Sequence, residues 1–208
     1  IVLSSNINFY INVEEEMKKY IDLPIYLEND ANCAALGEVW KGAAKDNNDV
    51  LFVVCGTGIG GAVIKDKKIH KGNNLHGGEF GYCILDRVHE GDKVSFKTWS
   101  KTGAVGALLE NVAKLKNISI DEIDGKKVFE LADNGDLDCI HAIDEFYLNN
   151  AMGIFNIQYM YDPEKIILGG AISSRPDFID KINEKIDIIM KNVQEGKVRP
   201  IIEKCKFE

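Results

Sequence analysis

The sequence has little that would direct a protein into a membrane, out of the cell or onto a nucleic acid. No apolar run approaches the roughly 18 residues that span a bilayer, and the opening IVLSSNINFY lacks the basic segment of a secretory signal. The formal net charge is −8, and lysines alternate with acidic residues instead of clustering. This balance disfavours nucleic acid or an anionic membrane as a partner of this segment. These absences together predict a cytoplasmic protein.

Paired cysteines are also absent. The chain has five cysteines, an odd number with no C-x-x-C pair, at positions Cys33, Cys55, Cys83, Cys139 and Cys205. Scattered cysteines of this kind are typical of reduced thiols. Cys83 and His89 lie close in the sequence, but nothing around them supplies two more ligands at metal spacing. We therefore expect no zinc and no dedicated metal site.

Strand and helix signals alternate along the 208 residues, which are 45% hydrophobic. The α/β class follows, with one large domain or two small ones. We expect a boundary in the charged connector 45–49. The expected strands are 1–4, 23–27, 51–55, 59–64, 83–85, 165–168 and 198–207, and the expected helices are 12–20, 33–40, 104–115, 126–132, 137–160 and one from Pro176 onward.

The glycine loop in LFVVCGTGIGGAVI, residues 51–64, is the most informative segment. Gly56, Gly58 and Gly61 satisfy G-x-G-x-x-G, but a dinucleotide fingerprint needs a helix directly after the glycines. Here the chain continues as a strand, which predicts a strand, a glycine turn and a second strand. Backbone N–H groups in such a turn can cradle phosphates because no Cβ blocks the approach. A glycine-rich hairpin without a ligand remains an open alternative.

Four segments together resemble the ROK family of repressors, open reading frames and sugar kinases. They are LPIYLENDANCAALGE at 23–38, GTGIGGAVI at 56–64, KGNNLHGGEFGY at 71–82 and ILGGAIS at 167–173. The resemblance implies the actin-like ATPase fold of hexokinases and ribonuclease H. It also implies a chain truncated at both ends: residues 1–48 would be a remnant of the first lobe, 49–197 the second lobe, and 198–208 a strand returning toward the first lobe.

The resemblance assigns roles to particular residues. Asp30 would be the general base, with a plain helix cap as the alternative. Asn29, Gly78 and Glu79 would bind the sugar, although Glu79 is also consistent with a solvated loop residue. The ATP phosphates would lie against Gly56, Thr57, Gly58, Gly60 and Gly61. The adenosine would lie against Gly169 and Gly170, whose alternative is an ordinary turn. Mg²⁺ would be held mainly by phosphates and water.

Two departures from the family pattern bear on function. Many members have a histidine followed by a C-x-C-G-x-x-G-C zinc loop, whereas this chain has Tyr82 and then residues 86–99 without those cysteines. A zinc-free branch is expected, with one sugar-positioning residue changed.

The family implies an ATP-dependent hexose kinase. The alternative is a sugar-sensing transcriptional regulator without kinase activity. The fragment alone is expected to be inactive, since half a lobe cannot close on its substrates. The expected partners are a sugar and a nucleotide. The apolar stripe on 137–160 is compatible with a homodimer, but the same stripe is needed for the core.

Overall fold

The computed structural model describes residues 12–207. The expected strand at 1–4 lies outside the described residues. The helices are α1 Val13–Lys18, α2 Asp30–Lys41, α3 Trp99–Gly103, α4 Val105–Lys116, α5 Gly125–Asp133, α6 Leu137–Tyr161 and α7 Phe178–Asn192, with short 3-10 turns at Phe80–Tyr82, Ile120–Glu122 and Ala171–Ser174. The strands are β1 Val50–Cys55, β2 Ile59–Lys65, β3 Lys68–Ile69, β4 Ile84–Glu90, β5 Lys93–Thr98, β6 Lys165–Gly169 and β7 Ile202–Lys204.

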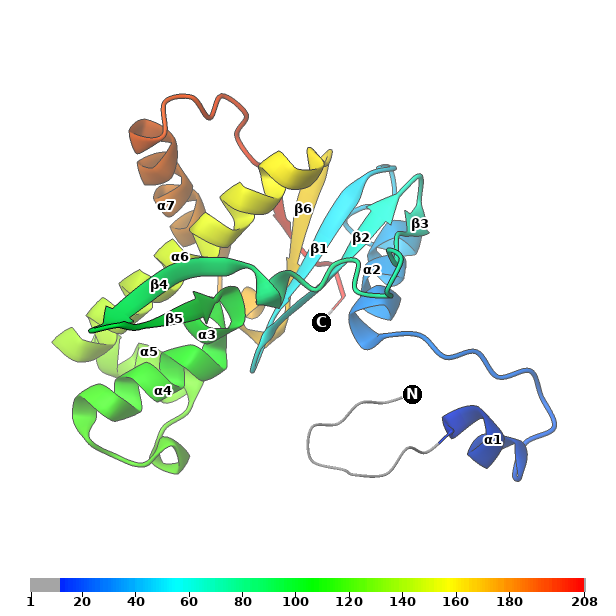
Figure 1. The fold of residues 1–208 in the computed structure, drawn as a ribbon, viewed down its shortest axis with the longest axis horizontal. Coiled ribbons are helices and arrows are strands. Elements are labelled where there is room, and N and C mark those ends of the chain that lie inside the picture. Colours follow the sequence, from blue (N-terminus) through cyan, green and yellow to red (C-terminus); the bar gives the residue numbers. More distant parts are fainter. Residues whose placement is uncertain (1–11, 208) are drawn as a thin grey trace.

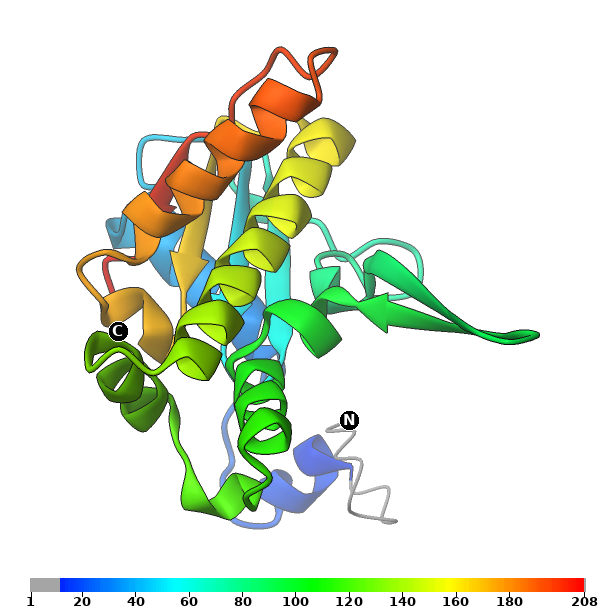
Figure 2. The same ribbon diagram turned by 90° about the vertical axis from the view of Figure 1, so that its left-hand side faces the viewer.

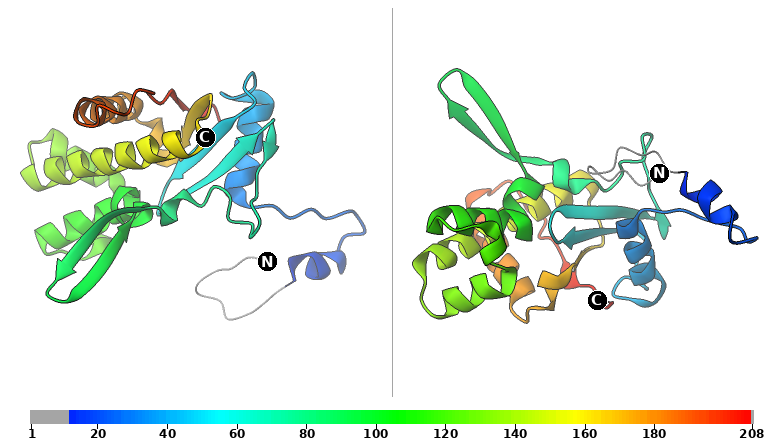
Figure 3. Two further views of the ribbon diagram at one scale, coloured as in Figure 1. Left: turned by 45° about the horizontal axis from the view of Figure 1, so that its top comes forward. Right: turned by 90° about the horizontal axis from the view of Figure 1, so that it is seen from below.

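A mixed five-stranded sheet in the order β3-β2-β1-β6-β7 forms the centre of the molecule. The β1–β2 and β2–β3 pairs are antiparallel, while β1–β6 and β6–β7 are parallel. Helix α2 covers one face of the sheet, and α6 and α7 lie on the other (Figures 1 and 3). The structure is therefore α/β, as the sequence predicted.

Alternate residues of β1 supply the two hydrophobic cores. Leu51 and Val53 pack in the larger cluster with α6 and α7, whereas Val50 and Phe52 pack in the smaller cluster with α2. This alternation is the two-residue period of a strand buried on both faces. The buried stripe of α6 crosses the larger cluster, where the Trp99 indole nitrogen donates to Asn150 Oδ1 at 3.1 Å.

Most of the predicted elements are confirmed, including the long helix α6, the glycine hairpin β1–β2 and the helices α4 and α5. The strand predicted at 23–27 is wrong. The backbone bends at Leu23 and has no ladder partner among the described residues, and the side chains of Leu23 and Tyr26 are exposed. Two other boundaries also differ: α7 begins at Phe178 rather than Pro176, and only 202–204 of the last predicted strand pair with β6.

The single short strand predicted at 83–85 is instead the start of a two-stranded ribbon. Strands β4 and β5 pair across the two-residue turn Gly91–Asp92, and Gly91 adopts φ +60°. A positive φ at the first turn position favours glycine. The ribbon projects away from the sheet and its helices (Figure 2). It covers most of residues 86–99, where the sequence predicted a segment without the zinc loop.

Candidate active site

An open cavity of about 490 Å³ lies between the start of α2 and the β1–β2 turn. Its lining residues are Asp30, Ala31, Ala34, Val54, Gly56, Thr57, Gly58, Ile59 and Gly60. The fold thus brings the predicted base, Asp30, to the same hollow as four residues of the predicted phosphate loop. The remaining predicted site residues are not among those that line it.

The β1–β2 turn presents bare backbone to this cavity. The N–H of Gly56 donates to the carbonyl of Gly58 at 2.9 Å. Over residues 12–207, the N–H groups of Thr57 and Gly58 have no hydrogen-bond partner. A Cβ at Gly56 or Gly60 would meet nothing within 4 Å, and one at Gly58 would meet only Ser100 Oγ at 3.6 Å. Open N–H groups beside unhindered glycines suit an oxyanion such as a phosphate.

The other glycines predicted to hold ATP are required by packing inside the protein. A Cβ on Gly61 would lie 2.5 Å from the Phe52 carbonyl oxygen, and one on Gly169 would lie 2.9 Å from the Phe52 ring. Gly170 has φ +97°, and its Cβ would lie 2.2 Å from the Cys55 carbonyl. These three glycines hold strand ends and the turn after β6 close to β1. Their close packing explains them without a ligand.

The first turn of α2 separates the roles of Asn29 and Asp30. Asn29 is the helix cap, because its side chain accepts a hydrogen bond from the N–H of Asn32 at 3.1 Å. The alternative in which Asp30 is the cap is therefore wrong. Asp30 Oδ1 accepts from the N–H of Ala31 at 2.8 Å, and Oδ2 has no hydrogen bond within the described chain. One carboxylate oxygen is thus available to a ligand.

Gly78 and Glu79 lie in the loop that follows β3, outside the lining of the cavity. Gly78 has φ +95°, and a Cβ there would lie 2.6 Å from the Cα of Ala62 in β2. The loop therefore rests on the sheet at Gly78. The next residue, Glu79, is exposed, and so is Tyr82 at 73%.

Two features beside the glycine turn had no signal in the sequence. The hydroxyl of Ser100 accepts from the N–H of Ile59 at 2.9 Å and donates to the carbonyl of the same residue at 3.3 Å. The first residue of α4, Val105, donates its N–H to the carbonyl of Gly56 at 2.9 Å. Ser100 and the start of α4 therefore fix the shape of the turn that faces the cavity.

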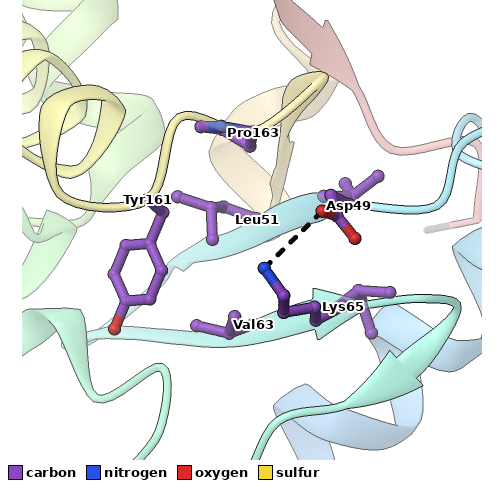
Figure 4. A pocket seen from close by; sticks show the side chains of 8 residues that line it. Asp49, Leu51, Val63, Lys65, Tyr161 and Pro163 are labelled. Carbon is purple, nitrogen blue, oxygen red and sulfur yellow. Dashed lines mark ion pairs between the residues drawn. The ribbon is translucent and has the colours of Figure 1, made fainter.

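A second hollow lies at the other end of β1 and β2 and is lined by Asp49, Val50, Leu51, Val63, Ile64, Lys65, Tyr161 and Pro163 (Figure 4). Its volume is about 30 Å³, which is room for little more than a water molecule. Lys65 Nζ lies 3.9 Å from Asp49 Oδ2 across it. Because the charges of Lys65 and Asp49 neutralise each other and the hollow is too small for a sugar or a nucleotide, it is not a substrate site.

The part of the chain that the structure describes contains no cluster of side chains suited to binding a metal ion and no reactive thiol lining the cavity. There, no group of three or more His, Cys, Asp or Glu side chains could hold a metal ion. Cys55 lies directly before the glycine turn, but burial raises its pKa to about 12, so it is a neutral thiol. None of the helices described is long and apolar enough to cross a bilayer.

The sequence profile described as "ROK family" matches residues 3–207. The chain belongs to the ROK family. A beta-glucoside kinase of Listeria monocytogenes is 34% identical over 176 residues, which are 85% of this chain and 60% of that protein. A xylose repressor of Bacillus spizizenii is 29% identical over 192 residues, covering 89% of this chain and 48% of that protein. The family thus includes both kinases and repressors.

Solved structures show the same fold. A ROK family protein from Streptococcus pneumoniae in complex with sucrose superposes with a TM-score of 0.83 at 35% identity, over 94% of this chain and 64% of that one. A ROK family glucokinase from Streptomyces griseus in complex with glucose and AMPPNP gives a TM-score of 0.75 at 25% identity, over 92% and 66%. The actin-like ATPase fold expected from the sequence is confirmed. The chain spans 60% of the length of the Listeria enzyme.

Proposed function

We propose that the complete protein is an ATP-dependent sugar kinase in which Asp30 is the general base. One observation carries the proposal: the free carboxylate oxygen of Asp30 and the bare backbone of residues 56–60 line the same cavity of about 490 Å³. Phosphoryl transfer to a hydroxyl needs a proton acceptor and a phosphate cradle facing one space. The beta-glucoside kinase and glucokinase relatives support the same activity.

Asp30 is placed to take the proton of the attacking hydroxyl. Its Oδ2, which accepts no hydrogen bond within the described chain, is the oxygen that would take this proton. Asn29 Oδ1 is occupied by the cap, which leaves the Nδ2 group to donate to a sugar oxygen. Glu79 would accept hydrogen bonds from further hydroxyls. The sugar would therefore lie between α2 and the loop that carries Glu79.

The phosphates of ATP would be bound by the β1–β2 turn. The N–H groups of Thr57 and Gly58 would donate to phosphate oxygens, and Gly56 and Gly60 would let the phosphates approach the backbone. Gly169 and Gly170 would border the adenosine by keeping the turn after β6 close to the end of β1. Mg²⁺, when bound with ATP, would neutralise phosphate charge, and its ligands would be mainly phosphate and water oxygens.

The proposed substrate is a hexose or a hexoside. The similar proteins include a beta-glucoside kinase and a putative N-acetylmannosamine kinase, both from Listeria monocytogenes. The similar Streptococcus structure contains sucrose. Tyr82 stands where many members have a sugar-positioning histidine. An exposed phenol in place of an imidazole changes both the reach and the hydrogen bonding of that position. We therefore propose a panel that includes disaccharides such as cellobiose beside glucose, mannose, fructose and N-acetylmannosamine.

The test is sugar-dependent ADP release by the complete protein with MgATP across this panel. Turnover with at least one sugar supports the kinase. A folded protein that binds a sugar but releases no ADP with any of them contradicts it and favours the second candidate, a sugar-sensing regulator like the xylose repressor. A basic helix-turn-helix encoded upstream of this chain would favour the regulator independently.

A further inference from the structure

The turn before α2 is tied to the loop after β3 by an ion pair. Glu28 Oε2 lies 2.6 Å from Lys71 Nζ, and the two side chains are 26% and 45% exposed. Glu28 directly precedes Asn29 and Asp30, and Lys71 begins the loop that leads to Gly78 and Glu79. The pair therefore connects two segments that lie far apart in the sequence and that both carry proposed sugar-site residues.

The second oxygen of the Glu28 carboxylate holds the start of α2. Oε1 accepts from the backbone N–H of Asn29 at 3.0 Å and from Asn32 Nδ2 at 2.9 Å. The hydrogen bonds from Lys71 and Asn32 lower the pKa of Glu28 to about 2, so the carboxylate is ionised at neutral pH. One charged group thus contacts the helix cap, the first turn of the helix and the loop.

Asn32 depends on this carboxylate. The residue is 8% exposed, and its Oδ1 is buried without a hydrogen-bond partner in the described chain. Its Nδ2 group donates to Glu28. Without that acceptor the whole buried amide would lack a partner, which is costly and favours a change in the local conformation. Losing Glu28 would therefore disturb the turn that presents Asn29 and Asp30.

The loop itself is fixed at two points. The N–H of Gly77 donates to the carbonyl of Lys71 at 2.8 Å, which closes residues 71–77 into a compact turn. Gly78 then rests on Ala62 of β2. Lys71 is the side chain that connects this closed loop to the α2 turn. Helix α2 also packs on β2, through Ala35 and Val39, so the Glu28–Lys71 pair adds a direct contact between two turns that both rest on the sheet.

We propose that Glu28 and Lys71 are positioning residues that set the spacing between the Asn29–Asp30 turn and the Gly78–Glu79 turn, and so determine the affinity for the sugar. The inference rests on the proposed function, because the sugar is taken to lie between these two turns. Neither residue touches the reacting atoms. The competing interpretation is an exposed ion pair of the ordinary kind, which contributes little to stability and nothing to sugar binding.

The test compares variants of the complete protein for sugar KM, ATP KM, kcat and melting temperature. Lys71→Met removes the charge and keeps the length of the side chain. Glu28→Gln keeps an acceptor for Asn29 and Asn32 but weakens the pair. Lys71→Arg preserves the cation. Lys65→Met is the matched control, because Lys65 belongs to a looser pair with Asp49, at 3.9 Å, at the end of β2 remote from the glycine turn.

Lys71→Met and Glu28→Gln should each raise the sugar KM about ten-fold, equivalent to about 1.4 kcal/mol, and leave the ATP KM unchanged. Lys71→Arg should restore most of the affinity. The double variant Glu28→Gln/Lys71→Met should be no worse than the more impaired single variant, because both remove one interaction. An unchanged sugar KM, an equal rise in both KM values, or the same effect from Lys65→Met would overturn the proposal.

Calorimetric titration with glucose, cellobiose and N-acetylmannosamine separates this inference from the proposed function. If the wild type binds one of these sugars but does not turn over, the kinase proposal fails, and the same ten-fold loss of affinity in the variants still supports the positioning role. If the wild type binds none of the panel, or if the variants bind as tightly as the wild type, the positioning role is wrong.

Discussion

The carboxylate of Glu38 should stabilise the end of α2 against the last residues of the chain. Its Oε2 accepts from the N–H of Ala43 at 2.7 Å, and its Oε1 accepts from the N–H groups of Lys206 and Phe207 at 2.9 Å each. The residue is only 2% exposed. Glu38→Ala removes all three hydrogen bonds at once, so it tests whether this carboxylate holds the helix that carries Asp30 in place.

The expected loss follows from the burial of each donor. An unsatisfied buried N–H costs about 1–3 kcal/mol, and Lys206 and Phe207 are exposed enough for water to compensate in part. We therefore expect the lower end for each donor, about 3 kcal/mol in total. For a chain of this length, that lowers the melting temperature by about 6–12 °C. Glu38→Gln should cost about half as much, because one amide oxygen still accepts while the amide nitrogen faces the N–H of Ala43.

Thermal unfolding followed by circular dichroism at pH 7 measures this effect. Gly42→Ala is a second route to the same loss, because its Cβ would lie 2.1 Å from Glu38 Oε2 and displace the carboxylate. Asp46→Ala is the control, since its ion pair with Lys45 is largely exposed. A Glu38→Ala protein that melts within about 1 °C of the wild type, or a Glu38→Gln protein less stable than Glu38→Ala, would refute the reasoning.

Three further outcomes are expected. Gly60→Ala should melt like the wild type but bind ATP about ten-fold more weakly. Gly61→Ala should lose stability, because its Cβ would lie 2.5 Å from the Phe52 carbonyl oxygen. The reverse pattern in melting temperature and ATP KM would contradict the distinction between the open Gly60 and the packed Gly61. In the native protein, a thiol reagent at pH 8 should react first with the exposed Cys33. It should not react with Cys55, which is buried and whose pKa is raised to about 12. A fast phase of the reaction that remains in Cys33→Ser would count against this. The pKa of Glu28 is depressed to about 2, so its stabilising effect is present above the unfolded pKa of about 4.5 and is lost as the pH falls toward 2. In urea unfolding, the free energies of unfolding of the wild type and Glu28→Gln should differ at pH 7 and converge below pH 4.5. A difference that stays constant with pH would be inconsistent with the ion pair.

Local patterns in the sequence were sufficient for the central elements. Helix α6 follows from its apolar spacing, and the β1–β2 hairpin follows from two apolar runs flanking a glycine turn. The predicted strand at 23–27 failed because an apolar segment becomes a strand only beside a neighbouring strand, and the described residues supply none there. The division into lobes at residues 48 and 197 stays a prediction.

The β4–β5 ribbon was not predicted for a different reason. Along DRVHE in β4 the only apolar residue is Val88, which is too few for a strand pattern. KVSFK in β5 does alternate, but its apolar side chains Val94 and Phe96 are exposed, so neither face of the ribbon is a buried one. Patterns of hydrophobicity report burial, and a ribbon that projects into solvent has little burial to report.

The candidate site was only partly accessible from the sequence. The motif order indicated Asp30 and the glycine turn, which the fold places at one cavity. The sequence alone does not distinguish Gly60, which is open, from Gly61, which packs against Phe52 and Phe80. The Glu28–Lys71 pair joins residues from separate motifs, and no local pattern indicates such a contact.

The assay that tests the central claim most directly compares the complete wild-type protein with Asp30→Asn, using MgATP and the sugar that gives the fastest ADP release. Asparagine keeps the size of the side chain and removes the proton acceptor. We expect kcat to fall by about 10²–10⁴-fold while sugar affinity, measured by calorimetry, stays nearly unchanged. Undiminished turnover in Asp30→Asn, or no sugar-dependent turnover in a folded wild type, would contradict it.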